Sequence, residues 1–261
     1  MKCIFSIDVI DAQEEFYTRS LVYKELIKMK IAIIGGTGGQ GLGIAIRFVQ
    51  AGEEVIIGSR SVEKAQAAVD KIKDLLENDE IPNLNAAENP DAAEEANILI
   101  LTVPLAAQKA TLLSIKDGAA GKILMDATGP LESAIGGSPT RCLILPEGAA
   151  SERAQKILPE TIVICAFNNI SSGALINFEE PIDCDCLISG DDQESKIIVA
   201  KLIEQIPGVR VVDCGPLERA QIIEKITPLL IGLNIKKTCK DAGIRITGID
   251  PECKWRRLVE G

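Results

Sequence analysis

Short apolar runs alternate with amphipathic segments along the first two thirds of the chain. Apolar runs bounded by glycine, proline or polar residues are typical of buried strands, and they occur at residues 30–34, 54–58, 97–104, 122–128 and 161–167. Helical spacing of apolar residues predicts helices at residues 41–52, 61–79 and 105–115. Almost wholly apolar strands that alternate with helices indicate an α/β fold with a doubly wound parallel sheet.

The pattern changes after about residue 173. Strands are expected at residues 183–190 and 208–215, around a helix at 192–206, and residues 216–243 are expected to be mostly helical. We therefore expect three parts, namely an N-terminal extension, an α/β domain and a smaller C-terminal α+β domain, at residues 1–28, 29–172 and 173–261.

The extension of residues 1–28 precedes a second methionine, Met29, and the first predicted strand follows at once. We interpret it as the product of an upstream start or as a poorly packed appendage, rather than as an integral helix. Its sequence contains no apolar stretch followed by a small-residue cleavage site, so it does not resemble a signal peptide.

A glycine-rich loop, "GGTGGQG", follows the first strand and opens the first helix. Gly36, Gly38 and Gly41 fit the G-x-G-x-x-G pattern in that setting. Gly36 permits the tight turn, Gly38 lets the backbone approach a pyrophosphate, and Gly41 lets helix and strand pack closely. Because the N-terminus of a helix attracts phosphate, the loop predicts a Rossmann-type dinucleotide site.

The second strand ends without the carboxylate that would accept hydrogen bonds from the ribose of NAD. Ser59 and Arg60 stand there instead, and Lys64 follows one helical turn later. A hydroxyl and a guanidinium suit a 2′-phosphate, which a carboxylate would repel. The residues favour NADP over NAD, although Arg60 and Lys64 could also be ordinary surface charges.

Composition narrows the class of protein. The net charge is −10 and aromatic residues make up 3% of the chain, so nucleic acid and anionic membranes are poor partners. No apolar run approaches the length of a membrane span. The eight cysteines include no C-x-x-C pair, and we expect them to be reduced thiols in a cytoplasmic protein.

The chain has no histidine, which excludes Ser-His and Cys-His mechanisms and histidine metal sites. Cys184 and Cys186 would share one face of a strand, but two thiolates alone do not make a metal site, so no metal is expected. Asp126 and Asp183 follow or open strands, where aspartate is usually a cap or turn residue. We therefore expect no catalytic side chain among them.

Several motifs together resemble one family. These are "MKIAIIGGTGGQGLG", "VIIGSR", "LTVP", "AFNNI", "GDDQESK", "DCGPLERAQIIEKITPLL" and "AGIRITG". Over residues 29–249 they resemble the NADP-dependent reductases of the deazaflavin coenzyme F420, found in archaea and some actinobacteria. The first motifs are common to many Rossmann enzymes, whereas the C-terminal ones are more specific.

The resemblance implies that a cleft between the two domains brings NADP and F420 face to face, so that a hydride passes between them without a catalytic side chain. It implies NADP contacts at Thr37, Gly38, Gly39, Gln40, Ser59, Arg60, Lys64, Pro104, Leu105, Lys109, Ile135 and Ser172. It implies deazaflavin contacts at Asn168, Ile170, Ala242 and Gly243. Some members of the family have a histidine where this chain has Asn168, and the loop at residues 129–151 is longer here than in the shortest members.

Two alternatives remain open. One is an NADPH-dependent reductase of a small imine or ketone, and the other is a non-enzymatic NADP(H) sensor. Only the interpretation as an F420 reductase predicts NADPH-dependent reduction of F420. The apolar helix predicted at residues 226–235 suits a homodimer interface.

Overall fold

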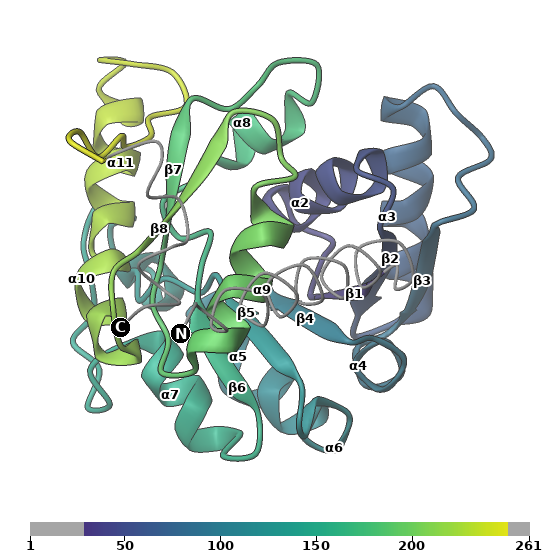
Figure 1. The fold of residues 1–261 in the computed structure, drawn as a ribbon, viewed down its shortest axis with the longest axis horizontal. Helices are drawn as coiled ribbons and strands as arrows, with labels where there is room; N and C mark the ends of the chain where they lie inside the picture. The colour runs from purple at the N-terminus through teal and green to yellow at the C-terminus, as the bar shows by residue number, and fades with distance from the viewer. Residues whose placement is uncertain (1–28, 250–261) are drawn as a thin grey trace, which may run out of the picture.

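The computed structural model describes residues 29–249, so the prediction for residues 1–28 lies outside the described residues. Six parallel strands form the main sheet in the order β3-β2-β1-β4-β5-β6 (Figure 1). This is the strand order of the Rossmann fold, which confirms the predicted fold class. The strands are β1 (Lys30–Ile34), β2 (Glu54–Ser59), β3 (Leu84–Glu88), β4 (Ile98–Leu101), β5 (Ile123–Asp126) and β6 (Ile162–Cys165).

Helices cover both faces of this sheet because alternate residues of each strand point to opposite sides. Ile31 and Ile33 pack in one apolar cluster, and Ala32 and Ile34 pack in the other. The first cluster contains residues of α2 (Gly39–Gln50), α3 (Val62–Leu75) and α9 (Gln193–Ile203). The second contains residues of α4 (Asn89–Glu95), α5 (Leu105–Ser114), α6 (Lys116–Ala119), α7 (Ala150–Ile157) and α10 (Ala220–Ile223).

A second sheet pairs β7 (Cys184–Ile188) with β8 (Val209–Asp213) in parallel. An isolated bridge between Cys165 and Ser189 joins β6 to the end of β7. Cys184, Cys186 and Ile188 pack in the same apolar cluster as Ile31. The two sheets therefore share a core across the predicted boundary at residues 172 and 173, and the division into two domains stays a prediction.

The last part of the described chain runs along the edge of the molecule away from β3 (Figure 1). A 3-10 turn, η2 (Leu217–Arg219), leads into α10 and then into α11 (Ile226–Ile235). Residues 236–249, here called the tail, contain no helix or strand. Residues 216–243 are thus helical only as far as Ile235, because Lys237 and Asp241 have left-handed backbone conformations, with φ of 55° and 54°, that interrupt a helix.

Several short elements were not predicted. These are the edge strand β3, the helices α4 and α6, the five-residue helix α8 (Ser172–Ile176), the 3-10 turn η1 (Glu132–Ile135) and α7. None of the helices in residues 29–249 combines the length and the apolar character needed to cross a membrane.

Candidate active site

The glycine-rich loop connects β1 to α2 at the point where the strand order reverses. A β-carbon at Gly36 would lie 2.8 Å from the carbonyl oxygen of Ile33, and one at Gly41 would lie 2.6 Å from the α-carbon of Gly36. Both positions therefore need glycine for backbone packing. A β-carbon at Gly38 would meet no atom within 4 Å, which leaves open space in front of the loop.

The N-terminus of α2 opens onto that space. Gly38 is its N-cap residue, no side chain caps the helix, and its first turn contains no acidic residue. Thr37, Gly38 and Gly39 are exposed. The first backbone N–H groups of a helix have no intrahelical acceptor, so this end is suited to an anion such as a pyrophosphate.

Ser59, Arg60 and Lys64 lie at the junction where β2 leads into α3. Ser59 is buried as the last residue of β2, whereas Arg60 and Lys64 are exposed. Ser61 caps α3 by accepting a hydrogen bond from the backbone N–H of Lys64. Neither cation forms an ion pair with a described residue. Both charges are therefore available to a phosphate at this end of the sheet.

A cavity of about 640 Å³ lies beside the glycine-rich loop. Nine of the residues predicted to bind a cofactor line it, namely Gly38, Gly39, Gln40, Pro104, Leu105, Asn168, Ile170, Ser172 and Ala242. The cavity therefore joins the glycine-rich loop, the segments that follow β4 and β6, and the tail. None of the described residues that line it has an ionisable side chain.

Nine predicted residues do not line this cavity. Six of them belong to the glycine-rich loop and to the junction of β2 and α3, namely Gly36, Thr37, Gly41, Ser59, Arg60 and Lys64, and the other three lie elsewhere. Lys109 is exposed on α5, and Ile135 is 74% exposed beside the lining residue Ala134. Gly243 packs against β7, where a β-carbon would lie 2.9 Å from the sulfur of Cys184. Their roles in binding stay predictions.

Asn168 is held at the cavity wall by three hydrogen bonds. Its amide nitrogen donates to the carbonyl oxygen of Thr128 (3.1 Å), and its Oδ1 accepts from the thiol of Cys165 (3.2 Å). Thr227 donates its hydroxyl to the backbone carbonyl of Asn168 (2.7 Å). Burial raises the pKa of Cys165 well above its ordinary value, so this thiol stays a donor.

The residue before Asn168 has an unusual backbone. Phe167 has φ of 65°, which is a strained conformation for a bulky side chain. Its carbonyl oxygen accepts a hydrogen bond from Gln40 at 3.0 Å. Strained backbone of this kind is typical of functional sites. The hydrogen bond from Gln40 links the end of β6 to the glycine-rich loop.

Arg47 is a further residue of this region that was not predicted. It is 2% exposed, and burial lowers its pKa. Its guanidinium donates hydrogen bonds of 2.7 to 3.2 Å to the carbonyl oxygens of Ala174, Leu175, Asn177, Phe178 and Glu180. These bonds hold α8 against α2, and so place Ser172 beside Gly39 at the cavity.

The tail reaches the cavity because two side chains fix its backbone. Ser171 donates its hydroxyl to Asp241 (2.6 Å), and Asn234 accepts a hydrogen bond from the backbone N–H of Ala242 (2.9 Å). Ala242 therefore lines the same cavity as Asn168 and Ile170.

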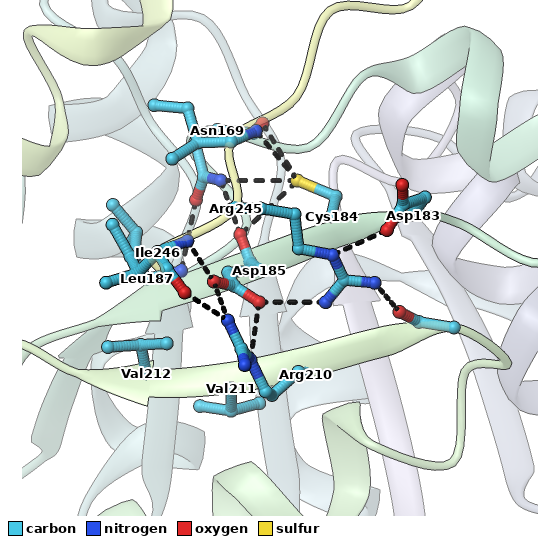
Figure 2. A network of polar contacts seen from close by, with 12 residues as sticks. Asn169, Asp183, Cys184, Asp185, Leu187, Arg210, Val211, Val212, Arg245 and Ile246 are labelled. Carbon is cyan, nitrogen blue, oxygen red and sulfur yellow. Dashed lines mark hydrogen bonds and ion pairs between the residues drawn. The ribbon is translucent and has the colours of Figure 1, made fainter. Parts of the chain in front are cut away.

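A buried carboxylate anchors the rest of the tail to β7 (Figure 2). Asp185 is fully buried and accepts two hydrogen bonds from Arg210, one from Arg245 and one from the backbone N–H of Ile246. Burial alone would raise the pKa of Asp185, but the hydrogen bonds from Arg210, Ile246 and Arg245 outweigh it and hold the pKa below its ordinary value. Asp185 therefore remains charged and ties three segments together.

The aspartates considered as acid–base candidates lie outside the cavity. Asp126 is fully buried and accepts hydrogen bonds from Gln108 (2.8 Å) and from the backbone N–H of Thr128 (2.8 Å). Burial raises its pKa to about 6, although these hydrogen bonds oppose the rise. Asp183 is exposed and pairs with Arg245 (2.6 Å). That neither is catalytic stays a prediction.

Glu224, like Asp185, is a buried acid that was not predicted to have a role. Its carboxylate caps α7 by accepting hydrogen bonds from the backbone N–H groups of Ala150 (2.8 Å) and Ser151 (3.0 Å). Burial raises its pKa to about 7. It is fully buried and does not line the cavity, so its role is to join α10 to α7 behind the site.

Comparison with known proteins decides the family. Residues 30–130 match the family described as coenzyme F420-dependent NADP oxidoreductases. The F420-dependent NADP reductase of Methanothermobacter thermautotrophicus is 54% identical over 227 residues, which cover 86% of this chain and 97% of that protein. The chain belongs to the F420-dependent NADP reductase family. The resemblance noted in the sequence is thereby confirmed.

Solved structures agree on the fold. A putative F420-dependent NADP reductase of Arthrobacter has a TM-score of 0.72 at 24% identity, over 84% of this chain and 99% of its own. A pyrroline-5-carboxylate reductase of Coxiella burnetii has a TM-score of 0.52 at 15% identity, over 90% of this chain and 77% of its own. At these identities the likeness shows the fold alone. Membership of the F420-dependent NADP reductase family rests on the sequence relatives.

Proposed function

We propose that this protein is an oxidoreductase that transfers a hydride between NADP(H) and coenzyme F420. The observation that carries the proposal is the composition of the cavity wall. Amide, hydroxyl and apolar groups line the cavity, and none of the lining residues among those described is ionisable. The two cofactors supply the hydride donor and acceptor, so the chemistry needs no acid or base from the protein.

The residues present fit both cofactors. The uncapped N-terminus of α2 and the open space at Gly38 suit the pyrophosphate of NADP. Arg60 and Lys64, which have no ion pair within residues 29–249, suit the 2′-phosphate. Pro104 and Leu105 would then border the nicotinamide, across the cavity from Asn168 and the tail.

The protein contributes by positioning the two cofactors and by excluding water from the cavity. Arg47 holds α8, the hydrogen bonds of Asn168 hold the end of β6, and Asp185 holds the tail. Apolar side chains such as Leu131, Leu230 and Ile231 line the same cavity. Fixed alignment of two reactants can supply a large part of the reduction in activation free energy. An error of about 1 Å in their position can lower the rate on the order of 10²-fold.

The test of this proposal is direct. Purified protein is mixed with NADPH and F420, and the absorbance of the oxidised deazaflavin is followed. We expect it to fall at a rate proportional to enzyme concentration. Reduction of 1-pyrroline-5-carboxylate, with no reduction of F420, would favour the imine reductase alternative. Binding of NADPH without reduction of either compound would favour the sensor.

The oligomeric state and the location in the cell are also proposals. Leu229 and Ile235 on α11 are 60% and 61% exposed, and Ile222 on α10 is 58% exposed. Large exposed apolar side chains on two consecutive helices support a homodimer. Sedimentation of the wild type and of Leu229→Asp tests it, since a dimer should dissociate in the variant. Free cysteines support a reducing compartment such as the cytoplasm.

A further inference from the structure

A second hollow adjoins the cavity at the beginning of the tail. It has a volume of about 450 Å³ and is lined by Asn234, Lys237, Cys239, Lys240 and Asp241. Asn234 lines both spaces, and Ala242, the next residue after Asp241, lines the main cavity. We call this hollow the lysine basin. The cavity and the lysine basin are therefore neighbours, with Asn234 at their common border.

The basin is positive in a protein whose net charge is −10. Lys237 and Lys240 are exposed, and neither forms an ion pair with a described residue. Asp241 contributes the carboxylate in this lining, and its Oδ1 is taken by the hydroxyl of Ser171 at 2.6 Å. The head groups of the two lysines thus remain available to an anion from outside.

The helix dipole of α11 explains the position of Lys237 but not that of Lys240. Lys237 follows the end of α11, where a positive charge is favourable next to the negative end of the helix dipole. That effect fades beyond the last turn, and Lys240 lies five residues after Ile235. The backbone that carries Lys240 is nevertheless fixed, because Ser171 holds Asp241 and Asn234 holds Ala242.

We propose that the lysine basin binds the anionic side chain of the deazaflavin coenzyme. This inference rests on the proposed function, which places the deazaflavin ring in the adjoining cavity. In coenzyme F420 the ring carries a ribitol chain that ends in a phosphodiester and glutamate carboxylates. Flexible lysine ammonium groups suit such a chain, because they meet an anion as point charges and need no fixed geometry. The basin would therefore select the full coenzyme over a core that lacks the anionic chain.

The experiment compares two ligands with and without the anionic chain. The dissociation constants of F420 and of 8-hydroxy-5-deazariboflavin, which lacks the phosphodiester and the glutamates, are measured by fluorescence titration. In Lys237→Gln/Lys240→Gln we expect F420 to bind about 3- to 20-fold more weakly at low salt, as loss of two exposed ion pairs implies. Binding of the deazariboflavin and of NADPH should not change. Lys116→Gln/Lys201→Gln removes the same charge from exposed positions on α6 and α9 and should bind F420 like the wild type.

Salt dependence of the wild type provides a test that needs no variant. F420 binding should weaken more steeply with rising salt than binding of the deazariboflavin, because only F420 carries the anionic chain. Equal salt dependence of the two ligands, or an unchanged F420 constant in the double variant, overturns the basin and leaves the proposed function intact. Equal weakening of both ligands in the double variant also overturns it, because the lysines would then act on the ring site. If the wild type reduces neither deazaflavin with NADPH, the proposed function itself fails.

Discussion

The anchor of the tail can be tested by replacing one buried carboxylate. Asp185 accepts four hydrogen bonds, from Nε and Nη2 of Arg210 at 2.8 and 2.6 Å, from Nη1 of Arg245 at 2.8 Å, and from the Ile246 N–H at 2.6 Å. Asp185→Asn keeps one acceptor oxygen and turns the other into an NH₂ group that faces donors. About two of the four bonds are then lost, and each bond to a charged group is worth roughly 1.5–3 kcal/mol.

We therefore expect Asp185→Asn to lower the free energy of unfolding by about 3–5 kcal/mol at pH 7, which is also the range for breaking a buried ion pair. Urea unfolding followed by circular dichroism measures it. Asp183→Asn is the matched control. It removes a partner of the same Arg245, but the side chain of Asp183 is 91% exposed, so the loss should be below about 1 kcal/mol.

The pH dependence gives a second readout. The pKa of Asp185 is lower in the folded protein than in the unfolded chain, so its stabilisation is complete above the unfolded pKa of about 3.9 and is lost as the pH falls through the folded value. The difference between wild type and Asp185→Asn should be constant from pH 5 to pH 8 and shrink below about pH 4. A loss as small as that of Asp183→Asn, or a difference that persists in acid, would refute the reasoning.

Three further variants test the cofactor sites. Arg60→Glu should weaken NADPH by at least about 10-fold and leave NADH unchanged, because it removes a charge-assisted contact to the 2′-phosphate; equal losses for both cofactors in a titration would contradict this. Ala242→Trp should lower F420-dependent turnover on the order of 10²-fold with NADPH affinity intact, since it fills the cavity beside the tail; full activity would remove the tail from the site. Asp126→Asn should lower turnover by much less than the roughly 10²–10⁴-fold of a lost general acid, and a collapse with normal cofactor binding would reveal a protein acid.

The main sheet and the glycine-rich loop are predictable because their signals are local. Strands buried on both faces of a parallel sheet must be apolar, and β1, β4 and β5 are apolar except for Lys30 at the start of β1 and Asp126 at the end of β5. The edge strand β3 escapes this rule, because its sequence "LNAAE" is partly exposed and lacks strong strand formers. The helix α8 has five residues and depends on Arg47, which comes from a distant part of the chain.

The residues that hold the site together depend on contacts that are remote in sequence. Arg47 reaches Leu175 across 128 positions, and Asp185 reaches Arg245 across 60. A signal does exist in both cases, since each is a charged residue inside an apolar run, "GIAIRFVQ" and "CDCLI". A charge in such a position must find partners within the core, but the sequence does not say which partners.

The central claim is that the protein places two cofactors in one cavity for direct hydride transfer. Its most direct test is to react F420 with NADPH deuterated at the transferring position of nicotinamide C4, and to analyse the reduced coenzyme by mass spectrometry. We predict that deuterium appears on the deazaflavin carbon in proportion to turnover, and that a reaction in D₂O with unlabelled NADPH adds none at that carbon. Loss of the label to solvent, or uptake of deuterium from D₂O at that carbon, would contradict the account.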